Sequence, residues 1–242
     1  MIRSKSGLPH EVNYRANIWA LKQLGATEII GLLAVGSLQQ EIAPGELSLV
    51  SQYFDFIKGN REKTFFGDGI AAHVSTAEPS YSSLATDLLS VANANGIELH
   101  TDKTYACVDG LRLGTLAESL FLQGLGCDLV GMTNVPEVFF AREAQICYLT
   151  IAIATDYDCW LDDPEQHVTV EQVISRYGAS LEKAKTLLRA YLQSLQETTA
   201  VEGQCGCRSA LACAVLTPIE AIPAQNVNCW QYYNADDRAC YC

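Results

Sequence analysis

Two carboxylates flank a tyrosine directly after the most apolar stretch of the chain. Residues 149–154 form an apolar run rich in β-branched side chains, which is typical of a strand buried on both faces. Thr155 then leads into Asp156, Tyr157 and Asp158. Ligands of open α/β sheets bind beyond the carboxyl ends of the strands. The two acids are therefore placed for acid–base chemistry or for binding a group that carries hydrogen-bond donors, and a solvated turn is the simpler alternative.

Two further polar motifs follow expected strands in the same way. Ala34-Val35-Gly36-Ser37 ends one apolar run, and Met132-Thr133-Asn134 ends another. We expect all three motifs to lie at one end of the sheet. Three motifs at one place indicate a functional site more strongly than any one of them alone.

The elements that must position these motifs alternate along the chain. Hydrophobic periodicity predicts the strands 28–35, 47–56, 97–108, 128–133 and the run ending at Asp156. The predicted helices are 12–24, 79–95, 114–125, 136–146 and 168–196, with Gly178 as a break in the last. This alternation predicts an α/β fold with a mixed, largely parallel sheet flanked by helices.

Composition excludes several classes of partner. The 242 residues are 49% hydrophobic and 18% charged, which is typical of a folded domain. The net charge of -12 disfavours nucleic acid and anionic membranes. Neither an apolar signal segment nor a run of membrane-spanning length is evident, so we expect a cytoplasmic protein. We expect one domain over residues 1–224 and a cysteine-rich tail of unknown role over residues 225–242.

The ten cysteines leave several interpretations open. Cys107, Cys127, Cys147 and Cys159 lie in or beside apolar segments, where free cysteine acts as a small hydrophobe. In Cys205-Gly206-Cys207, two cysteines lie only two positions apart. Three interpretations are open for this pair: half of a metal site, a redox pair, or a loop of reduced thiols. No second pair at zinc spacing and no nearby histidine completes a metal site in the sequence, so we favour the loop.

Four segments of the chain resemble the purine nucleoside phosphorylase and methylthioadenosine phosphorylase family. They lie between about Pro9 and about Thr217, at residues 12–21 (VNYRANIWAL), 34–38 (AVGSL), 132–137 (MTNVPE) and 154–160 (ATDYDCW). The resemblance implies a homotrimeric α/β enzyme that cleaves the N-glycosidic bond of a purine nucleoside with phosphate. Phosphate is a co-substrate, and neither a cofactor nor a metal ion is expected.

The resemblance also implies roles for individual residues. Asp156 is the expected general acid, which shares a proton with the departing base, and Asp158 accepts a hydrogen bond from the amino group of adenine. These roles favour S-methyl-5'-thioadenosine as the substrate. The remaining expected contacts are Tyr157 and Gly114 at the purine, Met132 and Ala34 at the ribose, Thr133, Ala34 and Leu33 at phosphate, and His73, Val170 and Val173 at the 5' substituent. Core or purely structural roles are the alternatives for Met132, His73 and the two valines.

The chain also departs from the family pattern. Relatives begin with a strand and a glycine-rich phosphate loop, which have no counterpart here, so we expect the first strands of the fold to be missing. Leu33 replaces a hydroxyl or amide side chain that helps to hold phosphate, and Leu116 replaces a frequent arginine. Each lost donor of this kind commonly costs about 2.7–4 kcal/mol of barrier. A catalytically impaired purine-binding or assembly protein is therefore the alternative to an active phosphorylase.

Overall fold

The computed structural model describes residues 7–161, 170–197 and 205–223. Its helices are α1 (Tyr14–Gln23), α2 (Ser82–Ala94), α3 (Leu116–Gly124), α4 (Asn134–Glu143), α5 (Val170–Glu197) and the 3₁₀ helix η2 (Ile219–Ala221). Its strands are β1 (Glu28–Ser37), β2 (Leu47–Phe56), β3 (Leu99–Val108), β4 (Leu129–Gly131) and β5 (Cys147–Asp156). These elements confirm the predicted alternation.

The five strands close into a barrel in the order β1-β4-β3-β2-β5. Three of the strand pairs, β1 with β5, β2 with β3 and β3 with β4, are parallel, while β1 with β4 and β2 with β5 are antiparallel. The predicted mixed, largely parallel sheet is thus confirmed. Closure was not predicted, because hydrophobic periodicity reports which faces of a strand are buried and not which strands pair.

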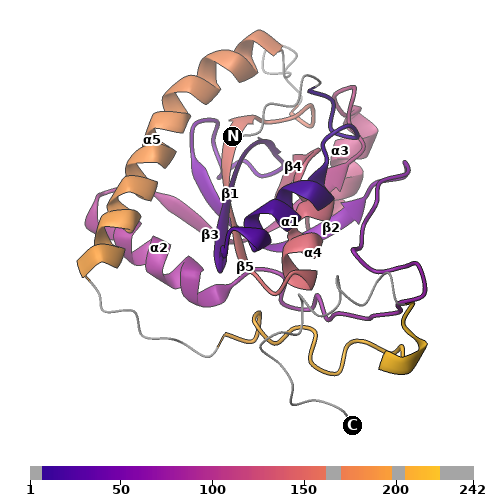
Figure 1. The fold of residues 1–242 in the computed structure, drawn as a ribbon. Coiled ribbons are helices and arrows are strands. Elements are labelled where there is room, and N and C mark those ends of the chain that lie inside the picture. The colour runs from indigo at the N-terminus through magenta and orange to yellow at the C-terminus, as the bar shows by residue number, and fades with distance from the viewer. Residues whose placement is uncertain (1–6, 162–169, 198–204, 224–242) are drawn as a thin grey trace.

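Helices surround the barrel. In Figure 1, α2 and α5 lie along one side and α3 lies at the opposite side. Leu84, Leu88 and Leu187 from α2 and α5 pack on Leu49 and Ile151 of the barrel. Because β5 is covered on both faces, every one of its residues is buried, as the apolar run predicted.

Element bounds differ from the predictions by at most three residues, and β4 and α5 depart from them in further ways. β4 has only three residues, because the chain leaves the sheet at Met132 to begin α4 and so frees Met132 and Thr133 from strand pairing. α5 continues through Gly178 without a break, and a Cβ at that position would meet nothing within 4 Å. In the described part of the chain, no helix is both long and apolar enough to cross a bilayer.

A buried polar network links β2, β5 and α4. The Tyr148 hydroxyl donates to Glu137 Oε1 at 2.5 Å and accepts from Asn134 Nδ2 at 2.8 Å. The Thr150 hydroxyl donates to Asn134 Oδ1 at 2.7 Å and lies 2.9 Å from the Tyr53 hydroxyl. Burial raises the pKa of Glu137, and the hydrogen bond from Tyr148 opposes this shift. These bonds satisfy polar groups that would otherwise cost stability in the core, and they hold the segment after Thr133.

Candidate active site

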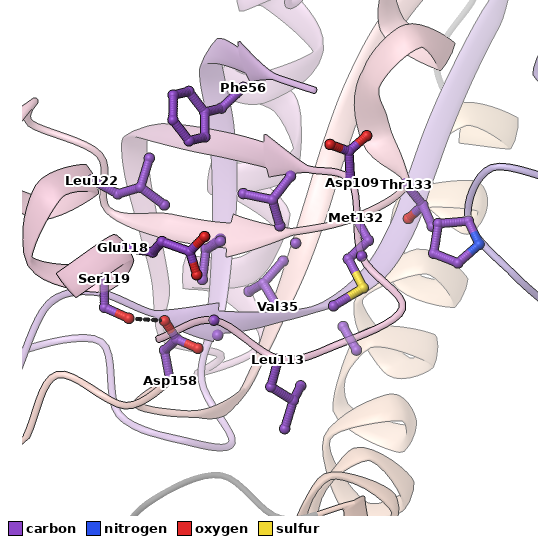
Figure 2. A pocket seen from close by; sticks show the side chains of 18 of the residues that line it. Val35, Phe56, Asp109, Leu113, Glu118, Ser119, Leu122, Met132, Thr133 and Asp158 are labelled. Carbon is purple, nitrogen blue, oxygen red and sulfur yellow. Dashed lines mark hydrogen bonds between the residues drawn. The ribbon is translucent and has the colours of Figure 1, made fainter. Parts of the chain in front are cut away.

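A cavity of about 710 Å³ lies where β1, β4 and β5 meet. Figure 2 shows side chains from several strands and from α3 around it. Seven of the eleven residues expected at the site line it, namely Leu33, Ala34, Gly114, Met132, Thr133, Asp156 and Asp158. The three polar motifs of the sequence therefore do converge on one cavity.

The strand register explains this convergence better than a shared carboxyl edge does. Gly36 of β1 pairs with Asp156 of β5 on one side and with Val130 of β4 on the other. The β1–β4 pair is antiparallel, so the chain after Val130 runs back along β1. Met132 and Thr133 consequently reach the cavity beside Ala34. The expectation that all three strands end at one edge was wrong, and the closed barrel produces the convergence instead.

The two acids form a connected pair. Asp156 is 5% exposed and Asp158 is 7% exposed. The Asp158 backbone N–H donates to Asp156 Oδ1 at 2.8 Å, and the Thr155 hydroxyl donates to Asp156 Oδ2 at 2.7 Å. Asp158 has a φ of 54°, which turns the chain sharply enough for both side chains to line the same cavity. The alternative of a solvated turn is therefore wrong.

Burial changes the acidity of Asp158. Its pKa is raised, chiefly by desolvation, although a hydrogen bond from Ser119 opposes the shift. The Ser119 hydroxyl donates to Asp158 Oδ2 (Figure 2). Ser119 lies on α3, whose first turn is closed by a capping box between Thr115 and Glu118. The start of α3 thereby sets the position of one acid.

Two glycines allow the backbone to approach the acids. A Cβ at Gly36 would lie 3.1 Å from Asp156 Oδ1, and one at Gly114 would lie 3.3 Å from Asp158 Oδ2. A side chain at either position would crowd the carboxylates. Gly114 thus lies against Asp158, on the side of the cavity where the resemblance expects the purine.

Arg61 supports the wall of the cavity that Met132 and Thr133 form. It is 8% exposed, and its Nη1 donates to the Met132 carbonyl at 2.7 Å and to the Val135 carbonyl at 3.1 Å. Its Nη2 donates to the Asp109 carbonyl at 2.7 Å. The Thr133 backbone N–H donates to the Tyr105 hydroxyl at 3.3 Å. These bonds hold the backbone that presents Met132 and Thr133 to the cavity.

The sequence analysis missed several lining or supporting residues. Arg61 and Ser119 belong to no motif that signalled them, and only their contacts identify them. Lys58 and Arg112 contribute two cationic side chains to the cavity lining. Arg112 donates to both carboxylate oxygens of Glu118, each at 2.8 Å, so much of its charge is already compensated.

The remaining expected residues lie elsewhere. Tyr157 does not line the cavity, and its hydroxyl donates to the Gln40 carbonyl at 3.2 Å. His73 is exposed and also lies outside the cavity, and its backbone N–H donates to the Ala214 carbonyl at 2.9 Å. Val170 and Val173 lie in the first turn of α5, but their side chains are outside the described residues. The predicted tail at 225–242 is outside them as well.

Two groups of metal-type ligands occur among the described residues, and neither lines the cavity. One consists of Cys147, Cys205 and Cys207, and the other of Glu46, Glu98 and His100. The cavity itself offers paired carboxylates, two cationic side chains, a hydroxyl and a largely apolar wall. Such a site suits a ligand with hydrogen-bond donors on one side and an apolar sugar face on the other.

The fold and the cavity define an α/β protein with a paired-acid site, and comparison with known proteins identifies the family. The sequence profile of the Phosphorylase superfamily matches residues 2–193, and the chain belongs to this family. A relative from Geobacter sulfurreducens, an S-methyl-5'-thioadenosine phosphorylase, is 42% identical over 90% of this chain and 74% of its own length. The enzyme of that name from Saccharolobus solfataricus is 44% identical over 86% of this chain and 76% of its own.

Solved structures agree with this assignment. A methylthioadenosine phosphorylase from an antarctic soil metagenomic library superposes with a TM-score of 0.83 at 36% identity, covering 94% of this chain and 77% of that one. The methylthioadenosine phosphorylase of Schistosoma mansoni in complex with adenine gives a TM-score of 0.81 at 31% identity, covering 86% of this chain and 80% of that one. The resemblance inferred from the sequence motifs is confirmed.

Proposed function

We propose that the chain catalyses the phosphorolysis of S-methyl-5'-thioadenosine to adenine and 5-methylthioribose 1-phosphate. The observation that supports this most is that Asp156 and Asp158 share one cavity with Met132 and Thr133. Relatives that are 39–44% identical over most of the chain are named as S-methyl-5'-thioadenosine phosphorylases. Release of free adenine would place the reaction in purine salvage.

The arrangement suggests a division of labour between the acids. Cleavage of the glycosidic bond develops positive charge on the ribose and negative charge on the purine, as in other glycoside cleavages. Asp156 donates or shares a proton with the departing base. Asp158, held by Ser119, accepts a hydrogen bond from the exocyclic amine of adenine. A 6-oxopurine offers no donor at that position.

The opposite wall holds the sugar and the phosphate. Met132 packs under the ribose, and Thr133 donates its hydroxyl to a phosphate oxygen. Lys58 also lines the cavity and supplies positive charge to a doubly charged nucleophile. Phosphate acts as a co-substrate, and no other cofactor takes part in the reaction.

We further propose that the active assembly is a homotrimer. His73 is exposed and does not line the cavity of its own chain, which agrees with a role at the 5' substituent in a neighbouring copy. The outer face of α3 exposes large apolar side chains, with Leu116 52%, Leu120 50% and Phe121 51% exposed. Exposed apolar patches commonly mark protein interfaces, and this one flanks the cavity.

A catalytically impaired purine-binding protein is the second candidate. It is favoured by the pairing of Arg112 with Glu118 and by the apolar Leu33, which together leave few free donors for phosphate among the described lining residues. Such a protein would bind adenine without turning over the nucleoside.

One assay separates the candidates. Purified protein is incubated with S-methyl-5'-thioadenosine, with and without phosphate, and adenine and the sugar product are quantified by chromatography. Phosphate-dependent release of adenine together with 5-methylthioribose 1-phosphate supports the phosphorylase. Adenine binding by calorimetry with no release supports the binding protein, and release without phosphate would indicate a hydrolase. Asp156→Asn is the matched control, since it preserves side-chain size.

A further inference from the structure

Three cysteines from distant parts of the chain meet outside the cavity. Cys147 is the first residue of β5, whereas Cys205 and Cys207 lie in the segment 205–223. The Cys147 and Cys205 sulfurs are 3.0 Å apart, and all three sulfurs lie within 4.8 Å of one another. All three cysteines are free. The sequence showed only the Cys205–Cys207 half of this group, since the third ligand comes from a strand some sixty residues earlier.

Packing of the C-terminal segment brings the two halves together. Leu211 and Ala214 are buried in the main core, and the Leu211 backbone N–H donates to Gln145 Oε1 at 3.2 Å. Val215 pairs with Ala72 in an isolated β-bridge. These contacts are independent of the thiols. The segment is therefore docked beside the start of β5 before any ligand binds, and the three sulfurs are preorganised.

The surroundings of the sulfurs offer a backbone donor and shield the sulfurs from solvent. The Cys207 backbone N–H donates to the Cys205 sulfur at 3.3 Å. Cys147 and Cys207 are buried and Cys205 is half-buried, so a bound ion would be largely shielded from solvent. Hard cations prefer oxygen ligands, whereas thiolates select thiophilic metal ions.

We propose that Cys147, Cys205 and Cys207 bind one thiophilic metal ion, and the ion that we expect is Zn²⁺. The bound ion connects the C-terminal segment, residues 205–223, to β5. A Zn–S bond of about 2.3 Å in tetrahedral geometry separates the sulfurs by about 3.8 Å, within the range that the cluster spans. Binding displaces the thiol protons to solvent, and a water molecule completes the fourth position. This site departs from the sequence-based expectation of no metal, and its role is structural because none of the three cysteines lines the cavity.

The test measures metal content in the full chain. Protein is purified anaerobically without chelators, and bound zinc and copper are quantified by mass spectrometry of the elements. We expect one equivalent of metal in the wild type, its loss in Cys205→Ser and Cys207→Ser, and its retention in Cys213→Ser. Cys213 is exposed and lies in the same segment, so it is the matched control. Copper in place of zinc at the same residues would identify Cu(I) as the ion and support the site.

Two further measurements detect metal binding to the wild type directly, so the test does not depend on every variant folding correctly. Cobalt added to the metal-free wild type should produce a near-ultraviolet sulfur-to-metal absorption that Cys207→Ser lacks, and zinc should raise the thermal midpoint of the wild type but not of that variant. Three results would overturn the proposal. They are failure of the wild type to bind zinc or copper, equal loss of metal in Cys213→Ser, and an intact mass two hydrogens lower with no metal, which would show a disulfide instead.

Discussion

Ser119 on α3 donates a hydrogen bond to Asp158 beyond the end of β5 (Figure 2). Both residues are buried, at 0% and 7% exposure, and they lie 39 residues apart in the sequence. The contact connects the capping box of α3 to one of the two acids. It gives Ser119 a positioning role that can be tested apart from catalysis.

Replacing Ser119 by alanine should weaken the recognition of adenine. A hydrogen bond to a charged group contributes about 1.5–3 kcal/mol, so we expect the KM for S-methyl-5'-thioadenosine to rise at least about tenfold with a smaller change in kcat. Because the Ser119 hydrogen bond lowers the pKa of Asp158, its loss should also move the pH profile of KM to higher pH. Steady-state kinetics between pH 5 and 8 measure both effects. Ser119→Thr retains the hydroxyl and should restore the profile, while an unchanged profile in Ser119→Ala would exclude the positioning role.

Replacing Asp156 by asparagine should remove the proton donor while preserving its contacts. The amide oxygen can still accept from the Asp158 backbone N–H, and the amide nitrogen can donate to the Thr155 hydroxyl, which is then free to donate to the Val35 carbonyl. General acid catalysis contributes about 10²–10⁴-fold, so kcat should fall by that factor with an unchanged thermal midpoint. Rapid-quench or steady-state assays of adenine release measure the loss. Wild-type turnover in this variant would exclude Asp156 as the general acid.

Replacing Asp158 by asparagine should stabilise the protein in a pH-dependent way. The pKa of Asp158 is raised by burial above the ordinary value of about 3.9, so ionisation destabilises the folded state. The wild type therefore loses stability as the pH rises through the unfolded and then the folded pKa, and the variant does not. Its thermal midpoint should exceed that of the wild type at pH 7, and the difference should shrink toward pH 4. The same variant should discriminate less between amino- and oxopurines. A difference in thermal midpoint between the variant and the wild type that stays constant with pH would contradict the assignment of Asp158 as a buried acid.

Glu137 provides a test of the buried network. Burial raises the pKa of this residue, and its carboxyl accepts from the Tyr148 hydroxyl. Glu137→Gln keeps an acceptor and should leave stability at pH 7 unchanged or higher. Glu137→Ala leaves the Tyr148 hydroxyl without that acceptor and should cost about 1–3 kcal/mol of unfolding free energy. Urea denaturation measures both. Equal losses in the two variants would show that the charge of Glu137, and not its hydrogen bond, matters.

Local pattern determined most of the elements and supplied the candidate residues of the site. β2 has its predicted bounds and β5 ends at Asp156 as predicted, and the Asn13 side chain caps α1 by accepting from the Ala16 backbone. The resemblance of short motifs to the family named Asp156, Asp158, Met132 and Thr133 as candidates, because each motif is contiguous in the sequence, and all four line one cavity. These features depend on periodicity and on residue type within a few positions.

Tertiary structure alone decided how these pieces meet. Barrel closure pairs Gly36 with both Val130 and Asp156, and no local pattern encodes that pairing. Arg61, Ser119 and Cys147 acquire their partners from segments dozens of residues away. The sequence by itself thus determined which side chains are available for chemistry, whereas long-range packing decided which of them stand together, because contacts between distant segments depend on the whole fold.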